Sequence, residues 1–151
     1  LVAVLDLFSR YVVSWELDDT LELPFVLTAV ERALAGQAPQ IWNSDPGSHF
    51  TSPHYQQRLT GAGVQISMDG KGRAMDNIFV ERLWRTVRYE EVYLKGSACP
   101  RAARQGLTEY LGFYNERRLH QAMGYRTPAA VYFGTETPSE VDERAGLLST
   151  T

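Results

Sequence analysis

The sequence has little of several features that would mark a disulfide-linked, zinc-binding or membrane-spanning protein. Its 151 residues include one cysteine, Cys99, which excludes an intramolecular disulfide. The three histidines, at positions 49, 54 and 120, show no zinc-ligand spacing. The longest apolar runs, such as 1–5, are far too short to cross a bilayer, and no basic-then-apolar signal peptide opens the chain. We therefore expect a cytoplasmic protein without membrane contact.

Lysine is also scarce, whereas arginine is not. Only two of the fifteen basic residues are lysines, Lys71 and Lys95, and many of the arginines lie between Arg73 and Arg126. The net charge of −3 argues weakly against a polyanion partner, but a basic face can coexist with an acidic total. A hydrophobic content of 44% suits one core in a single globular domain. Because the chain begins at Leu1 inside an apolar run, we interpret it as part of a longer protein.

Strands and helices alternate in the predicted order of elements. Two apolar runs, 1–8 and 11–17, are separated by two residues, which predicts an antiparallel hairpin. Further strands are predicted at 40–45 and 64–68. Helices are predicted from Pro24 to about Gly36 and at 52–60, 75–89 and 100–117, with Ser52 as an N-cap. This order is typical of an α/β domain with a mixed sheet.

Asp45 stands at the tip of a predicted buried strand, within the sequence NSDPGSHFTS at 43–52. In α/β sheets ligands bind at the carboxyl ends of strands, and the Pro-Gly turn would leave this carboxylate uncovered. Magnesium prefers oxygen ligands and usually takes one or two carboxylates together with substrate phosphates. Glu81 is the best second carboxylate, because Arg85 and Arg88 share its predicted helix face and could contact those phosphates.

Both carboxylates also have a purely structural interpretation. An Asp before Pro-Gly is usually a turn or capping residue, and a Glu on a helix face usually pairs with an Arg four positions later. Taken singly, Asp45 and Glu81 favour that interpretation. The sequences that flank the two residues point instead to a shared catalytic role.

These flanking sequences resemble the DDE transposases of bacterial insertion sequences, which are relatives of the retroviral integrases. The resemblance rests on NSDPGSHFTS, on GRAMDNIFVERLWRTVRYEEVY, on LVAVLDLFSRYVVSWEL near the start, and on YLGFYNERRLHQAMGYRTPAAVYF at 110–133. It implies an RNase H-like fold, a mixed sheet flanked by helices, here lacking its first, central strand. The corresponding domain division is a catalytic core at 1–133, incomplete at its N-terminus, and a C-terminal tail at 134–151 that we expect to be flexible.

The resemblance assigns roles to individual residues. Asp45 is similar to the second aspartate, and Glu81 to the glutamate, of a catalytic triad that binds two Mg²⁺ or Mn²⁺ ions and cuts and joins DNA strands. Arg88 matches a position where the family places a DNA-contacting Lys or Arg, and two helical turns bring it back over Glu81. Asn77, one turn before Glu81, could orient that carboxylate, contact a phosphate or cap the helix.

The first aspartate of the triad has no match in this sequence. In the family it lies on the strand before the one that LVAVLDLFSR resembles, so we expect the chain alone to be inactive. Asp6 falls within the family's D-F-S-R motif, where the resemblance implies that Asp6 and Arg10 have structural roles. Two functions stay open: a transposase core acting as a homo-oligomer on transposon ends and target DNA, or a non-catalytic remnant that binds DNA or partner subunits.

The segment FYNERRLHQAMGYRTP allows two further interpretations. Its polar residues could contact DNA, or its aromatic residues could fasten the last helix onto the sheet, with Arg117 and Arg118 left to approach phosphates. The candidate DNA contacts are Tyr114, Asn115, Arg118 and His120. We favour packing for the aromatic side chains of Tyr110, Phe113, Tyr114 and, in the preceding helix, Trp84.

Overall fold

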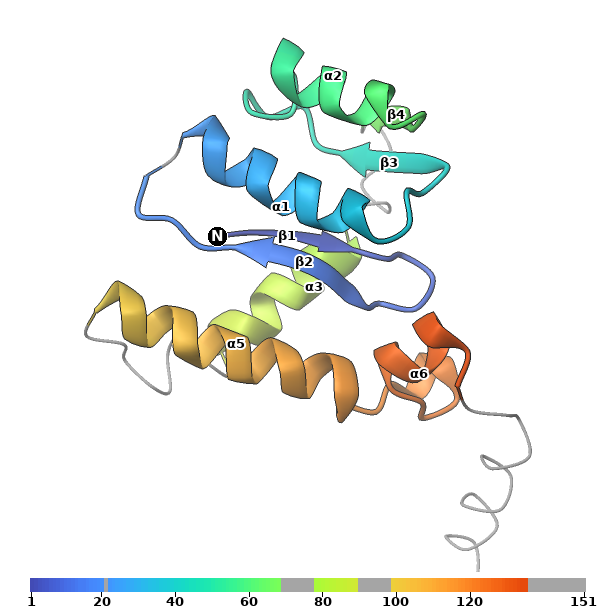
Figure 1. Cartoon of the computed structure of the whole chain (residues 1–151). Coiled ribbons are helices and arrows are strands. Elements are labelled where there is room, and N and C mark those ends of the chain that lie inside the picture. Colours follow the sequence, from blue (N-terminus) through green and yellow to red (C-terminus); the bar gives the residue numbers. More distant parts are fainter. Residues whose placement is uncertain (21, 69–77, 90–98, 136–151) are drawn as a thin grey trace, which may run out of the picture.

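The computed structural model describes residues 1–20, 22–68, 78–89 and 99–135. They form an α/β arrangement in which a β-hairpin lies between helices on both faces (Figure 1). In chain order the elements are β1 (Val2–Leu5), β2 (Val12–Glu16), α1 (Leu23–Ala35), β3 (Ile41–Ser44), α2 (Pro53–Gly61), β4 (Gln65–Met68), α3 (Ile78–Val87), α5 (Pro100–Glu116), a 3₁₀ helix (Gln121–Met123) and α6 (Pro128–Phe133). The predicted α/β class is confirmed.

A polar side chain shapes the hairpin between β1 and β2. The Asp6 carboxylate accepts hydrogen bonds from the backbone N–H of Ser9, at 2.8 Å, and from its hydroxyl, at 2.6 Å. Arg10 completes the turn with a φ of 63°, a left-handed conformation that is uncommon for a residue with a side chain. The contacts of Asp6 are therefore those of a turn residue, as the sequence interpretation expects.

The helices begin where the sequence signals predict. Pro24 lies in the first turn of α1, and the helix buries one apolar stripe that includes Val26, Ala29 and Val30. Ser52 caps α2, because its hydroxyl accepts a hydrogen bond from the backbone N–H of Tyr55 at 3.3 Å. Helix α6 was not among the predicted elements, although Thr127 followed by Pro128 is a readable start signal and Thr127 caps the helix.

The strands form two small sheets rather than one continuous mixed sheet. β1 and β2 pair antiparallel, and β3 and β4 pair parallel, with Trp42 opposite Ile66. Within the described ranges no ladder joins the two pairs, so β1 and β3 each have a single strand partner. These two small sheets are compatible with the predicted RNase H-like arrangement, in which a missing central strand would leave two facing strand edges unpaired. That a central strand is missing stays a prediction.

Two apolar cores lie on opposite sides of the hairpin. The first joins α1, α2, β3 and the residue before β4, around Val26, Trp42 and Leu59. The second joins β2, α3 and α5, around Val12, Leu83 and Leu111. Helix α3 thus belongs to the face of the hairpin that α1 does not cover (Figure 1).

The aromatic residues of α5 and α3 mostly pack as expected. Tyr110 and Tyr114 are buried in the second core, and Trp84 packs against it. Phe113 is also expected to pack, but that expectation is wrong, because the residue is 45% exposed. No helix in the described part of the chain is both long and apolar enough to cross a membrane. Most of the predicted tail, residues 136–151, lies outside the described residues.

Candidate active site

Asp45 directly follows the last residue of β3. The strand is anchored by Trp42, which is buried and donates from its ring N–H to the Tyr55 hydroxyl at 2.8 Å. Burial raises the pKa of the Tyr55 hydroxyl, and the negative charge of Asp45 adds to that shift. The side chain of Asp45 is exposed, so the strand ends by presenting its carboxylate to solvent.

One oxygen of the Asp45 carboxylate is held by the following turn. Oδ1 accepts a hydrogen bond from the backbone N–H of Gly47 at 2.7 Å, whereas Oδ2 makes no hydrogen bond to any residue that the structure describes. A Cβ at position 47 would lie 2.7 Å from Oδ1 and 3.3 Å from the Phe50 ring, so only glycine leaves this room. The turn interpretation and the ligand interpretation are compatible, because one oxygen serves the turn and the other stays available.

Glu81 lies on the exposed face of α3. The opposite face packs Leu83 and Val87 into the second core, which matches the predicted amphipathic pattern. Glu81 forms no ion pair with Arg85 or with any other described residue, so the interpretation as a simple i, i+4 partner is not supported by contacts.

The predicted DNA-contacting residues fall partly within the described structure. Arg85 and Arg88 are exposed, and neither forms an ion pair with a residue in the described ranges. Asn77 lies outside the described residues, so its predicted role stays a prediction.

The described contacts do not join Asp45 to Glu81. Asp45 follows a strand of the first core, whereas α3 packs into the second core, on the other face of the hairpin (Figure 1). Residues 69–77, which connect β4 to α3, lie outside the described ranges. Among the described side chains, no group of three or more His, Cys, Asp or Glu residues is placed to hold a metal ion. Shared metal binding by these two carboxylates therefore stays a prediction.

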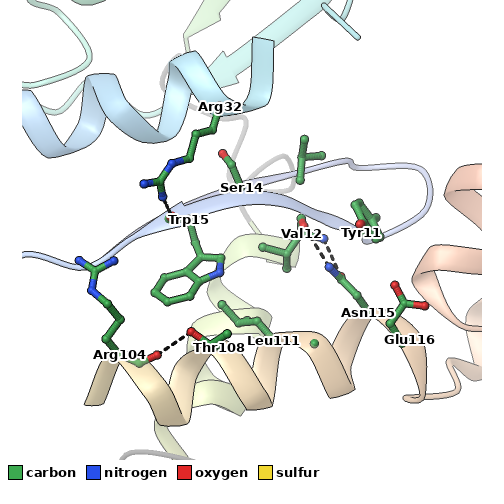
Figure 2. A pocket seen from close by; sticks show the side chains of 12 residues that line it. Tyr11, Val12, Ser14, Trp15, Arg32, Arg104, Thr108, Leu111, Asn115 and Glu116 are labelled. Atoms are coloured by element: carbon green, nitrogen blue, oxygen red, sulfur yellow. Dashed lines mark hydrogen bonds between the residues drawn. The ribbon is translucent and has the colours of Figure 1, made fainter. Parts of the chain in front are cut away.

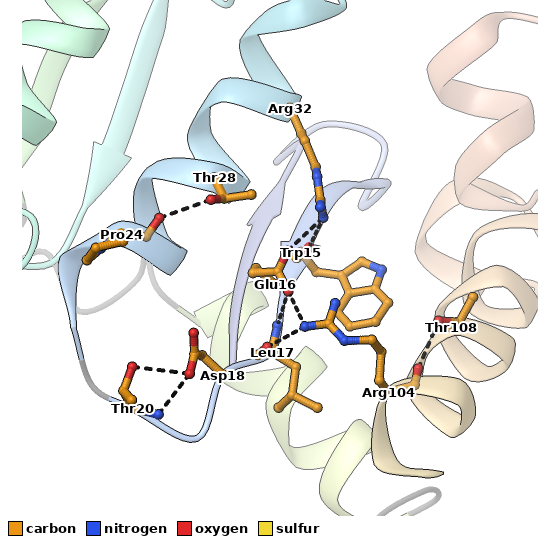
Figure 3. A network of polar contacts seen from close by, with 10 residues as sticks. All are labelled: Trp15, Glu16, Leu17, Asp18, Thr20, Pro24, Thr28, Arg32, Arg104 and Thr108. Atoms are coloured by element: carbon orange, nitrogen blue, oxygen red, sulfur yellow. Dashed lines mark hydrogen bonds and ion pairs between the residues drawn. The ribbon is translucent and has the colours of Figure 1, made fainter. Parts of the chain in front are cut away.

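A second polar centre, which the sequence analysis did not identify, surrounds Glu16. This carboxylate is 8% exposed and accepts from Arg104 at 2.5 Å, Arg32 at 2.8 Å and the Leu17 backbone N–H at 3.0 Å (Figure 3). Burial alone would raise the pKa of Glu16, but the hydrogen bonds from Arg104 and the Leu17 N–H, together with the charges of both arginines, outweigh burial and lower it. The network connects β2 to α1 and α5. Arg32 and Arg104 lie 16 and 88 positions after Glu16 in the sequence, so no local sequence pattern predicts the network.

A shallow groove of about 550 Å³ runs along the free edge of β2, between α1 and α5 (Figure 2). Asn115 occupies it like a short piece of strand: its side-chain oxygen accepts from the Val12 N–H at 2.9 Å, and its side-chain nitrogen donates to the Val12 carbonyl at 3.0 Å. Asn115 is buried. Its role is therefore to cover the strand edge, and the interpretation of Asn115 as a DNA contact is wrong for this arrangement.

Comparison with known proteins defines the class of this domain. Two family models, both described as "Integrase core domain", match residues 1–74 and 62–128. The transposase for insertion sequence element IS629 of Shigella sonnei is 30% identical over 128 residues, which cover 83% of this chain and 43% of the relative. The transposase for IS904 of Lactococcus lactis is also 30% identical, over 82% of this chain and 51% of the relative. The putative transposase InsK for IS150 of Escherichia coli is 30% identical, over 83% and 45%.

The chain belongs to the integrase core family, in the form found in the transposases of bacterial insertion sequences. It spans about half the length of the curated relatives that it matches. The resemblance expected from the residues around Asp45 and Glu81 is thereby confirmed at the level of the family.

Proposed function

We propose that this chain is the catalytic-core portion of a DDE-type transposase, in which Asp45 and Glu81 supply two of three metal-binding carboxylates. The observation that carries the proposal is the placement of Asp45: an exposed carboxylate at the end of a buried strand, with one oxygen held by the turn and the other available. Membership in the integrase core family supports assigning that carboxylate to DNA strand cleavage and strand transfer.

The donor chemistry of the two residues fits a divalent metal. Both are exposed carboxylates that form no ion pair within the described structure, and Mg²⁺ and Mn²⁺ prefer such hard oxygen ligands. A pair of these ions would activate a water or a DNA 3′-hydroxyl as the nucleophile. It would also stabilise the leaving oxygen at the scissile phosphate.

The residues of the chain position the carboxylates and the DNA. The hydrogen bond to Gly47 fixes the direction of the Asp45 carboxylate before any ligand arrives, which reduces the ordering cost of binding. Arg85 and Arg88 project from the exposed face that also carries Glu81, where their charges can neutralise DNA phosphates. Asn77 would lie one turn before Glu81, where it could orient that side chain.

The third carboxylate, in this proposal, comes from polypeptide outside residues 1–151, and the chain alone does not cleave DNA. Two observations support this. β1 and β3 each have one strand partner among the described strands, which leaves one edge of each for a further strand. The chain also spans only about half of its relatives. Assembly of several copies on transposon ends and target DNA, and a cytoplasmic location, stay predictions.

A second candidate function is a non-catalytic module that binds DNA or partner subunits. Arg85 and Arg88 would serve this function as well, because their exposed charges can contact DNA phosphates without a metal site. The two functions differ in whether cleavage can be restored when the remainder of a transposase is supplied.

The test joins residues 1–151 to the preceding segment of a matching transposase and measures cleavage of a labelled DNA end in Mg²⁺. Asp45→Asn and Glu81→Gln should each abolish cleavage, because each change keeps the side-chain volume and removes the ligand charge. Asp18→Asn, an exposed aspartate in the turn after β2, is the matched control and should leave cleavage unchanged. Cleavage by either site variant would defeat the assignment, and DNA binding without cleavage by the unmodified polypeptide would favour the non-catalytic module.

A further inference from the structure

The contacts that hold helix α3 in the second core all lie on one side of Glu81 in the sequence. The α3 residues in or against that core are Leu83, Trp84 and Val87. Glu81 precedes them, in the first turn of the helix, where the backbone N–H groups have no acceptor within the helix and the ends of helices fray. The position of Glu81 therefore depends also on contacts made by the residues before it.

Arg10, in the β1–β2 hairpin, makes such a contact with the first turn of α3. Its Cζ atom lies 3.2 Å from the centre of the Phe79 ring, so the guanidinium stacks closely on the ring face. Burial lowers the pKa of Arg10, and the charge of Arg82 in α3 adds to this shift, as expected for a guanidinium beside the helix. Phe79 and Leu83 lie one turn apart, so the ring contact and the second core hold α3 before and after Glu81.

Arg10 is itself fixed by the turn of the hairpin. Its φ of 63° is a left-handed conformation, which residues with a side chain rarely adopt. Its backbone N–H donates to the Asp6 carbonyl at 2.8 Å, and its guanidinium donates to the Leu7 carbonyl. A glycine would adopt this φ without strain, so the turn alone does not account for an arginine at this position.

We propose that Arg10 is a positioning residue for Glu81. By stacking on Phe79 it holds the first turn of α3, and with it the Glu81 carboxylate, at a fixed place relative to the hairpin. A metal ligand that is already in place loses less conformational freedom when the metal binds. This inference rests on the proposed function, because it presumes that Glu81 is a metal ligand.

Hydrogen exchange of the full chain tests the contact without metal and without activity. The backbone N–H groups of residues 82–84 bond to the carbonyls of residues 78–80, so their exchange reports opening of the first turn. Arg10→Gly should speed this exchange by about two- to thirtyfold, the range of a cation–π contact, and should leave the amides of α5 unchanged. Phe79→Leu should have the same effect, whereas Phe79→Tyr keeps a ring face for the guanidinium and should retain slow exchange.

Tyr125→Gly is the matched control for the backbone effect of the Arg10→Gly change. Tyr125 also has a side chain and a positive φ, of 59°, and its side chain is exposed. Its replacement relieves similar strain and leaves the Arg10–Phe79 contact in place, so exchange at residues 82–84 should stay slow. Unchanged exchange in Arg10→Gly would overturn the proposal, and so would faster exchange throughout the chain, which would show that Arg10 supports the whole fold. Equal exchange in Phe79→Tyr and Phe79→Leu would also overturn it.

Cleavage by the polypeptide joined to a transposase segment, as described above, connects the contact to Glu81. Arg10→Gly should raise the Mg²⁺ concentration for half-maximal cleavage by about two- to thirtyfold. A merely structural defect would reduce the amount of active protein and leave that concentration unchanged. An unchanged Mg²⁺ requirement despite faster exchange would therefore overturn the positioning of Glu81. Cleavage by Glu81→Gln would instead defeat the proposed function, and with it the role of Arg10 toward Glu81, whatever the exchange rates are.

Discussion

Replacing Glu16 by Gln should test how far one buried carboxylate holds this domain together. The Oε1 atom of Glu16 accepts from Arg104 and from the Leu17 backbone N–H, and Oε2 accepts from Arg32 (Figure 3). A Gln side chain can keep its carbonyl oxygen in the Oε1 position. Its NH₂ group would then face the Arg32 guanidinium, which is also a donor, so that bond would be lost.

The expected magnitude follows from the burial of the partners. A hydrogen bond to a charged group contributes about 1.5–3 kcal/mol. The arginine side chains are 57% and 47% exposed, so water compensates part of the loss. We therefore expect Glu16→Gln to lower the free energy of unfolding by about 2 kcal/mol, which corresponds to a melting temperature roughly 4–8 °C lower for a domain of this size.

Urea denaturation of the full chain measures this difference, with Glu31→Gln as the control. Glu31 also pairs with an arginine, Arg58, at 2.7 Å, but both side chains are about half exposed, so its replacement should cost less than about 1 kcal/mol. An equal effect of the two substitutions would refute the reasoning, because it would show that burial of Glu16 adds nothing.

The stability difference between the unmodified chain and Glu16→Gln should depend on pH. The folded-state pKa of Glu16 is lowered, so its contribution is complete above the unfolded pKa of about 4.3 and is lost as the pH falls through the lower, folded value. The gap between the unmodified chain and Glu16→Gln should therefore be constant from neutral pH to about pH 5 and should shrink in more acidic buffer. A gap that widens on acidification would contradict the assigned direction of the shift.

Four further substitutions test other parts of the structure. Asn115→Leu removes two buried hydrogen bonds at the edge of β2 and should lower the free energy of unfolding by about 1–3 kcal/mol. Gly112→Ala lies on an exposed turn of the same helix, where a Cβ meets nothing within 4 Å, and should raise the free energy of unfolding by about 0.5–1 kcal/mol. Urea denaturation measures both changes. Gly47→Ala places a Cβ 2.7 Å from the Asp45 carboxylate and should reduce Mg²⁺-dependent cleavage by the joined polypeptide; full activity would show that the turn does not position the carboxylate. Arg88→Ala should flatten the salt dependence of DNA binding by about one unit, and an unchanged slope would remove Arg88 from the interface.

Much of the secondary structure could be predicted because it depends on residues that are near one another in the chain. The alternation of apolar residues, the cap at Ser52, the proline in the first turn of α1, and the turn at Asp6 to Arg10 all act over a few positions. The placement of Asp45 at the end of a strand could be read in the same way. The flanking sequences of Asp45 and Glu81 were sufficient for the family, which the comparisons confirm.

The arrangement of these elements was decided by contacts between distant residues. The pairing of Asn115 with Val12 spans 103 positions, and Arg104 reaches Glu16 from another helix. The parallel pairing of β3 with β4 could not be predicted either, because an apolar run shows that a strand is buried but not which neighbour it pairs with. Hydrogen bonds between strands and ion pairs between helices depend on the positions of whole elements, so only the tertiary structure determines them.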